Sequence, residues 1–209
     1  MDAVVLVHGF GRTSWSMCGL AFYLRRSGTR VVNWRYPTLR LSVEAHAAEL
    51  RAFVLSLASS DVDRIHFVTH SLGGIVARAA LAEPIAKVGR VVMLAPPNCG
   101  SRAARLLSRV SSWPRSLVQL SDAPDSFVRT LGAPCVEVGV IAGRYDGKVP
   151  VARTHLVGQA DHLVVPAFHT WLMWRRDVCR QVSAFLRDGR FTRGGGQTAS
   201  GSSAALSRR

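Results

Sequence analysis

Six short runs rich in Val, Ile and Leu recur along the chain, and longer stretches with helical spacing separate them. A short apolar run followed by an amphipathic stretch is the pattern of a βα unit, and repeated units build a mostly parallel sheet with helices on both faces. We therefore predict an α/β fold, a three-layer α/β/α sandwich with a mostly parallel sheet of six strands. The expected strands are Ala3–Val7, Arg30–Trp34, Arg64–Thr69, Arg90–Ala95, Cys135–Ala142 and Asp161–Val165.

Three of the intervening stretches predict helices that pack on this sheet. Ser42 is a typical N-cap for a helix whose apolar residues recur at steps of three and four. A second helix of small residues runs from 72 to 82. A third apolar stripe extends from Trp171 through Trp174 to Phe185. The helical spacing of the two tryptophans favours core positions for them over a place in a ligand pocket.

Two segments depart from this alternation. Residues 101–131 contain two prolines and read as short helices and turns inserted between strands, so we expect them to cover a pocket. Whether this cover acts as a lid is left open by the sequence. The last twenty residues, 190–209, are mostly Gly, Ser, Thr, Ala and Arg, a composition with little to bury. We expect a folded domain over 1–189 and a disordered tail over 190–209.

The chain is strongly basic, with 27 Lys and Arg against 13 Asp and Glu and a formal net charge of +14. Such a balance is common in nucleic-acid-binding proteins, but there the charges gather in runs or on one face. Here single Arg residues are scattered from Arg12 to Arg209, and Lys occurs only at 87 and 148. We therefore expect a small-molecule partner and no specific nucleic acid, with at most weak attraction to anionic surfaces.

No apolar run approaches the roughly 18 residues that a membrane-spanning helix needs. The residues after Met1 lack the pattern of a signal peptide, so we expect a cytoplasmic protein. Cysteines occur at 18, 99, 135 and 179 without the close spacing of a metal site. We expect them to be free thiols in the core.

The strongest chemical signal follows the third expected strand. There Thr69-His70-Ser71-Leu72-Gly73-Gly74 passes directly from strand to helix. A serine at the apex of such a turn has a strained backbone, exposes its hydroxyl above the sheet, and needs small neighbours where strand and helix approach. Gly73 meets that need, whereas Thr69 stands where the G-x-S-x-G pattern has Gly. Taken alone, the run also fits an ordinary tight turn, so support must come from elsewhere.

A glycine-containing loop after the first strand supplies part of that support. His8-Gly9-Phe10-Gly11 follows Val7 directly, at the sheet edge where ligands of parallel sheets bind. We expect the backbone N–H groups of Phe10 and Leu72 to form an oxyanion hole. Standing alone, the loop would fit a ligand-free βα turn equally well.

A nucleophilic serine also needs a base and a carboxylate that orients the base. Asp146 lies in a turn just after the fifth expected strand, and His169 follows the sixth. The chain order Ser71, Asp146, His169 thus places each residue just after a strand, at one edge of a parallel sheet. This coincidence is much more specific than any single motif, and it predicts a catalytic triad.

Other acids and histidines offer alternatives. Asp161 is an alternative to Asp146 as the orienting carboxylate, but it begins the last strand, at the end remote from the site, and His162 has the same disadvantage. His8 and His70 flank the site in sequence and fit supporting hydrogen bonds better than base catalysis. Surface or strand positions are expected for His46, His66 and His155. A metal site made from His155, Asp161, His162 and His169 matches no familiar ligand spacing, so we predict no metal.

Together these residues resemble the α/β-hydrolase family, and within it the small bacterial lipases and esterases that begin with a strand and V-H-G and carry an H-S-x-G-G turn. The likeness spans Ala3 to Phe191 and includes the D-G-x-V-P and H-T segments. It implies that Ser71 is the nucleophile, His169 the base and Asp146 its orienting carboxylate. The loop 95–101 resembles a segment that borders the substrate cleft in these relatives.

The resemblance implies hydrolysis of carboxylic esters through an acyl-enzyme, without cofactor. One fold hosts many activities, so two alternatives stay open. The same triad serves thioesterases and acyltransferases. A non-catalytic domain of this fold would use its basic surface to bind anionic partners instead.

Overall fold

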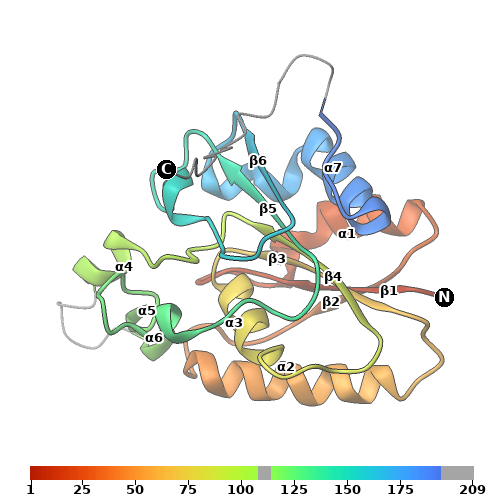
Figure 1. Ribbon diagram of the computed structural model, residues 1–209, viewed down its shortest axis with the longest axis horizontal. Coiled ribbons are helices and arrows are strands. Elements are labelled where there is room, and N and C mark those ends of the chain that lie inside the picture. The colour runs from red at the N-terminus through yellow and green to blue at the C-terminus, as the bar shows by residue number, and fades with distance from the viewer. Residues whose placement is uncertain (108–113, 194–209) are drawn as a thin grey trace, which may run out of the picture.

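The computed structural model of the chain describes residues 1–107 and 114–193 and contains one six-stranded sheet (Figure 1). The strands lie in the order β2-β1-β3-β4-β5-β6, and all neighbours pair in parallel. Their bounds are β1 Ala3–Val7, β2 Arg30–Trp34, β3 Ile65–His70, β4 Val88–Leu94, β5 Val138–Gly143 and β6 Asp161–Val165. The predicted fold class is confirmed. The largest differences in strand bounds are at β4, which begins two residues earlier than expected, and at β5, which begins three later.

Helices cover both faces of the sheet. On one face lie α2 (Val43–Ala58) and α3 (Leu72–Ala80), and on the other lie α1 (Cys18–Arg26) and α7 (Arg176–Asp188) (Figure 1). The strand β1 has five buried residues in a row because alternate side chains enter the two cores. Sequence analysis did not predict α1, a nine-residue helix that buries Leu20, Ala21 and Leu24.

The apolar pattern from Trp171 to Phe185 predicted one continuous C-terminal helix, but the structure divides this segment into two helices. A 3-10 helix, η3, covers His169–Trp174, Arg175 is extended, and α7 follows. With three residues per turn, Trp171 and Trp174 come to the same side of η3. They are 60% and 49% exposed, so the expectation that they lie in the core was wrong.

The insertion between β4 and β5 contains three short helices, as the sequence suggested: α4 (Arg102–Leu107), α5 (Arg115–Val118) and α6 (Phe127–Thr130). Its residues 108–113, with Trp113, lie outside the described part. A buried carboxylate anchors the insertion, because Asp122 pairs with Arg105 at 3.0 Å and with Arg153 at 3.1 Å. The insertion thereby lies beside the carboxyl ends of the strands, at the left in Figure 1.

The folded domain extends past the expected boundary at residue 189. Gly189 ends α7 with a left-handed φ of 73° and turns the chain back, so that Phe191 is buried against Phe185 at 5.0 Å between ring centroids. The N–H of Phe191 donates to Asp161 Oδ2 at 2.8 Å. The overall composition of 190–209 hid this one core aromatic residue. The tail expected beyond it, residues 194–209, lies outside the described part.

All four cysteines are free thiols, as expected, but only Cys179 is buried. Cys18 and Cys99 are half-buried, and Cys135 is exposed, so the expected core placement holds for one of the four. Within residues 1–107 and 114–193, no helix is both long and apolar enough to cross a bilayer.

Candidate active site

Ser71 occupies the sharp turn between β3 and α3. Its φ of 52° and ψ of −120° are unusual for a residue with a side chain, and such strain persists only where the surroundings impose it. Here the flanking strand and helix impose it, and the Ser71 N–H donates to Leu94 O at 2.9 Å on the neighbouring strand. The side chain is half-buried and lines a cavity.

Two glycines make this turn possible. A Cβ on Gly73 would lie 2.6 Å from His8 O and would also collide with Val7 O, so only glycine lets α3 approach the end of β1. A Cβ on Gly74 would lie 3.3 Å from Thr69 Oγ1. The absence of a side chain at Gly74 therefore leaves room for the threonine that replaces the usual glycine before the turn.

Asp146 and His169 form a hydrogen-bonded pair at the ends of β5 and β6. Asp146 Oδ2 lies 2.6 Å from His169 Nδ1, and its Oδ1 accepts the N–H groups of Lys148 and Val149 at 2.9 and 2.8 Å. The Asp146 side chain is fully buried. Because a carboxylate only accepts hydrogen bonds, this contact places a proton on Nδ1 of His169, and Nε2 is then the acceptor of the neutral imidazole tautomer.

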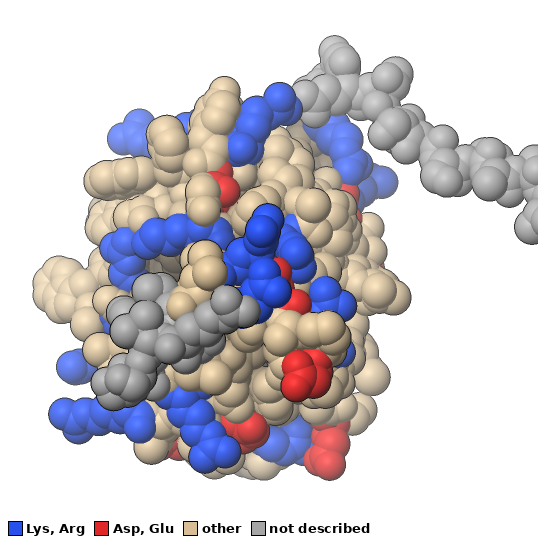
Figure 2. All heavy atoms as spheres, turned by 90° about the vertical axis from the view of Figure 1, so that its left-hand side faces the viewer, with Lys and Arg blue, Asp and Glu red and all other residues tan. Residues whose placement is uncertain are grey.

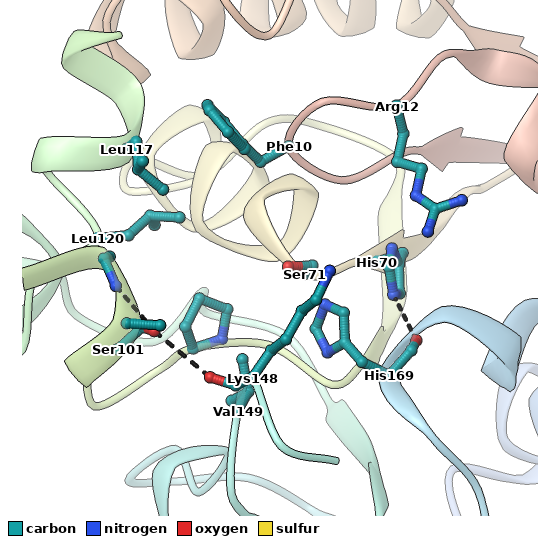
Figure 3. Close-up of a pocket in the computed structure, with 13 residues that line it drawn as sticks. Phe10, Arg12, His70, Ser71, Ser101, Leu117, Leu120, Lys148, Val149 and His169 are labelled. Atoms are coloured by element: carbon teal, nitrogen blue, oxygen red, sulfur yellow. Dashed lines mark hydrogen bonds between the residues drawn. The ribbon is translucent and has the colours of Figure 1, made fainter. Parts of the chain in front are cut away.

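Ser71 and His169 line the same cavity, whose volume is about 300 Å³ (Figure 3). No hydrogen bond joins the Ser71 hydroxyl to the imidazole in this structure. The chain thus brings the predicted acid and base into contact and sets the predicted nucleophile in the cavity beside them.

The predicted oxyanion-hole residues flank Ser71. The N–H groups of Phe10 and Leu72 donate to no other residue in the described part of the chain. The loop that carries Phe10 is held from both sides, since Tyr36 Oη donates to His8 O at 2.6 Å and Gly11 N–H donates to Thr38 Oγ1 at 3.0 Å. Two backbone donors are therefore free to bind an oxygen near Ser71.

His70 and His8 occupy supporting positions, as the sequence suggested. His70 Nε2 lies 3.0 Å from the carbonyl oxygen of His169, which accepts its proton, while His70 Nδ1 is buried without a partner (Figure 3). Burial, followed by the neighbouring His169, holds the pKa of His70 well below its ordinary value, so its ring is neutral. His8 does not line the cavity; its ring lies 4.5 Å from that of Tyr36.

The alternative acid and base residues, Asp161 and His162, lie away from Ser71. Asp161 begins β6 opposite Gly139, at the amino end of the strands, where it binds Phe191 N–H and Arg193. His162 contacts Thr154 Oγ1 at 2.9 Å and stacks on His155. Across the described residues, no three His, Cys, Asp or Glu side chains converge as a metal site requires.

The sequence-based expectation for His46 was wrong. His46, expected at the surface or in a strand, is fully buried in α2 against the edge of the Tyr36 ring. His66 is a buried residue of β3, as expected for a strand histidine, and its Nδ1 accepts Arg90 N–H at 2.8 Å. His155 is exposed.

The insertion and the loop 95–101 line the cavity, as the sequence suggested, but most of the individual wall residues were not named from the sequence. Two cations, Arg12 and Lys148, line the cavity together with a set of largely apolar residues: Phe10, Pro97, Ala103, Ala104, Leu117, Leu120 and Val149. Arg12 immediately follows the oxyanion loop, and Lys148 comes two residues after Asp146. Their closeness to predicted site residues in sequence was the one available signal. The apolar wall from the insertion was expected only as a segment, through the prediction that residues 101–131 cover a pocket.

The fold and this cavity together define a hydrolase-type α/β protein. The model of the alpha/beta hydrolase family matches residues 4–199, and the chain belongs to that family. No curated protein matches the sequence.

Solved structures of lipases and esterases are similar to the chain. The mature lipase BlEst2 of Bacillus licheniformis matches 88% of this chain and 90% of its own at 15% identity, with a TM-score of 0.69. An esterase of Thermogutta terrifontis matches 90% of both chains at 17% identity and a TM-score of 0.64. Phospholipase PlaB of Legionella pneumophila, in complex with thio-NAD, matches 74% of this chain at 23% identity and a TM-score of 0.61, and the match spans only 44% of PlaB. Identities this low show a shared fold.

Proposed function

We propose that the chain hydrolyses carboxylic esters through an acyl-enzyme on Ser71. The observation that carries this proposal is the strained turn that holds Ser71 in the same cavity as His169, whose imidazole is hydrogen-bonded to the buried Asp146. A serine alcohol is a weak nucleophile alone, and such a pair supplies the base and its orientation. The known lipases and esterases with this fold agree with the proposal.

The chemistry follows from the roles of the three side chains. His169 Nε2 takes the proton of the Ser71 hydroxyl as the oxygen bonds to the ester carbonyl carbon. The resulting oxyanion accepts the N–H groups of Phe10 and Leu72, and each such donor contributes a factor of about 10²–10³ to kcat. The bond to the alcohol oxygen then breaks, and His169 returns its proton to that oxygen.

The second half of the cycle releases the acid. Water attacks the acyl group on Ser71 and passes a proton to His169, which then protonates the departing serine oxygen. The carboxylic acid leaves, and Ser71 and His169 regain the protonation that they had before the reaction. The structure shows no hydrogen bond between the Ser71 hydroxyl and the His169 imidazole, and catalytic hydrogen bonds of this kind often form only in the complex with substrate.

The experiment compares Ser71→Ala with Ser101→Ala, which removes a second hydroxyl from the same cavity. We expect Ser71→Ala to lose labelling by a fluorophosphonate probe and turnover of 4-nitrophenyl butyrate, while its far-UV circular dichroism stays that of the parent. Ser101→Ala should still be labelled. Labelling that persists in Ser71→Ala would refute the proposal.

A further inference from the structure

Arg12 and Lys148 give the cavity around Ser71 a positive character. Both line it, whereas no Asp or Glu does among the described residues. Neither cation forms an ion pair with a carboxylate in the described part of the chain. Cations that line a cavity without a protein counter-ion favour an anionic ligand.

Each cation is tied to the proposed catalytic groups by the backbone or by a hydrogen bond. Arg12 follows the loop of Phe10 and is half-buried, and its Nη2 donates to Thr170 Oγ1 at 3.0 Å, directly after His169. Lys148 is exposed, and its own N–H holds Asp146 Oδ1. Their charges also contribute, after burial and His169, to the lowered pKa of His70. Arg12, Lys148 and His70 line the same cavity as Ser71.

The cavity is divided into two chemically different sides (Figure 3). Phe10, Leu117 and Leu120 line one side of Ser71, and Arg12 and His70 lie on the other. Lys148 extends from the loop after β5 toward the region of Ser71 and His169. An alkyl chain is best accommodated on the apolar side, where its burial is favourable, and an anion on the side with the cations.

The position of His169 decides which part of the ester carries the anion. His169 must protonate the departing alcohol oxygen, so the alcohol lies on the His169 side and the acyl chain extends toward the leucines. The cations stand on the alcohol side. On the basis of the proposed ester hydrolysis, we infer that the substrates are acyl esters whose alcohol part carries a phosphate or carboxylate group.

The wider surface agrees with this inference. Figure 2 shows the face at the carboxyl ends of the strands, where Lys and Arg side chains cover more of the surface than the acidic side chains between them. With a net charge of +14, the whole molecule attracts anions over distances set by ionic strength. This long-range attraction brings any anion close, while Arg12 and Lys148 select where on the substrate the charge lies.

The test uses pairs of hexanoyl esters in which one member carries an anionic group in its alcohol part and the other a neutral group in its place, and release of hexanoate is measured. One pair is 1-hexanoylglycerol 3-phosphate and 1-hexanoylglycerol; the other is O-hexanoyl lactate and its methyl ester. The kcat/KM ratio of charged to neutral ester is measured for the parent, Arg12→Gln, Lys148→Gln and the double variant. Arg30→Gln is the control, because Arg30 is exposed at the start of β2. It therefore lies at the amino ends of the strands, away from the cavity at their carboxyl ends.

We expect the parent to prefer the charged ester in at least one pair, and the pair affected tells phosphate from carboxylate. Each single substitution should lower the ratio about tenfold, as expected for loss of one charge-assisted hydrogen bond, and Arg30→Gln should leave it unchanged. A parent ratio near one in both pairs overturns the inference while ester hydrolysis stands. So does an equal loss on both members of each pair in the variants. If no ester is consumed and Ser71 is not labelled, the proposed function fails as well.

Discussion

Replacing Asp146 by Asn keeps the shape of the carboxylate but changes what its two ends do. Oδ1 accepts two backbone N–H groups, and Oδ2 accepts the proton of His169 Nδ1. If the amide NH₂ faced the backbone, two N–H donors would lose their acceptor, at about 1–3 kcal/mol for each buried group. The amide oxygen therefore stays with the backbone, and the NH₂ group faces His169.

In that orientation Nδ1 of His169 must accept a hydrogen bond, so the proton moves to Nε2. The imidazole then has no lone pair for the Ser71 proton. A base held in the wrong tautomer lowers kcat by about 10⁴, which corresponds to about 5 kcal/mol in the barrier. Both backbone hydrogen bonds survive, so the thermal midpoint should change little.

The assay is steady-state hydrolysis of 4-nitrophenyl butyrate, with the thermal midpoint measured on the same samples. Asp161→Asn is the matched control, because Asp161 lies at the amino end of β6 and Asp146 follows the carboxyl end of β5. We expect it to keep its activity but lose stability, because Oδ2 accepts Phe191 N–H while Oδ1 accepts His162 N–H and Arg193, and an amide leaves only one of these two ends an acceptor. The reasoning is refuted if Asp146→Asn retains more than about a tenth of the parent kcat, or if Asp161→Asn is the variant that loses activity.

Three further predictions concern stability. Gly73→Ala should destabilise the fold by about 1–3 kcal/mol in chemical denaturation, because the new methyl group meets the backbone oxygen of His8; an unchanged midpoint would contradict the close approach. Phe191→Ala should cost about 3 kcal/mol by the same measurement, since the ring is buried, whereas a free tail from residue 190 predicts no change. Burial, followed by the charge of His155, lowers the pKa of His162 to about 4, while the unfolded imidazole titrates near its ordinary 6.5. Between these values only the unfolded chain takes up the proton, so the thermal midpoint should fall from pH 7 to pH 5 by more in the parent than in His162→Gln; equal falls would contradict the shift.

Sequence patterns were sufficient to predict the position of a residue wherever that position depends on its immediate neighbours in the chain. Strands of a parallel sheet are buried on both faces and therefore read as continuous apolar runs. Ser71, Asp146 and His169 each follow such a run, so their common edge could be predicted before their contacts were known. The Thr69 departure was interpretable only with the structure, because the space that accommodates it comes from Gly74.

Patterns failed where tertiary contacts determine the local geometry. The stripe from Trp171 has helical spacing, yet the chain forms a 3-10 turn there that places His169 at its start, beside Asp146. A continuous α-helix would have satisfied the same periodicity. Packing of Leu172 and Met173 into the core while both tryptophans stay exposed cannot be derived from a two-class pattern of polar and apolar residues.

Which side chains of the insertion form the cavity wall could not be predicted for a related reason, and this separates the chemistry of the site from its selectivity. Leu117 and Leu120 reach the cavity because long-range contacts hold the insertion in place: Ser116 Oγ donates to Thr38 O at 2.7 Å, and the buried Asp122 pairs with Arg153. Such anchors join segments far apart in sequence and leave no periodic trace. The proposed catalytic groups depend instead on strand ends, which any member of the fold shares. Substitutions in the anchors should therefore alter which acyl chains are accepted before they alter the reactivity of Ser71.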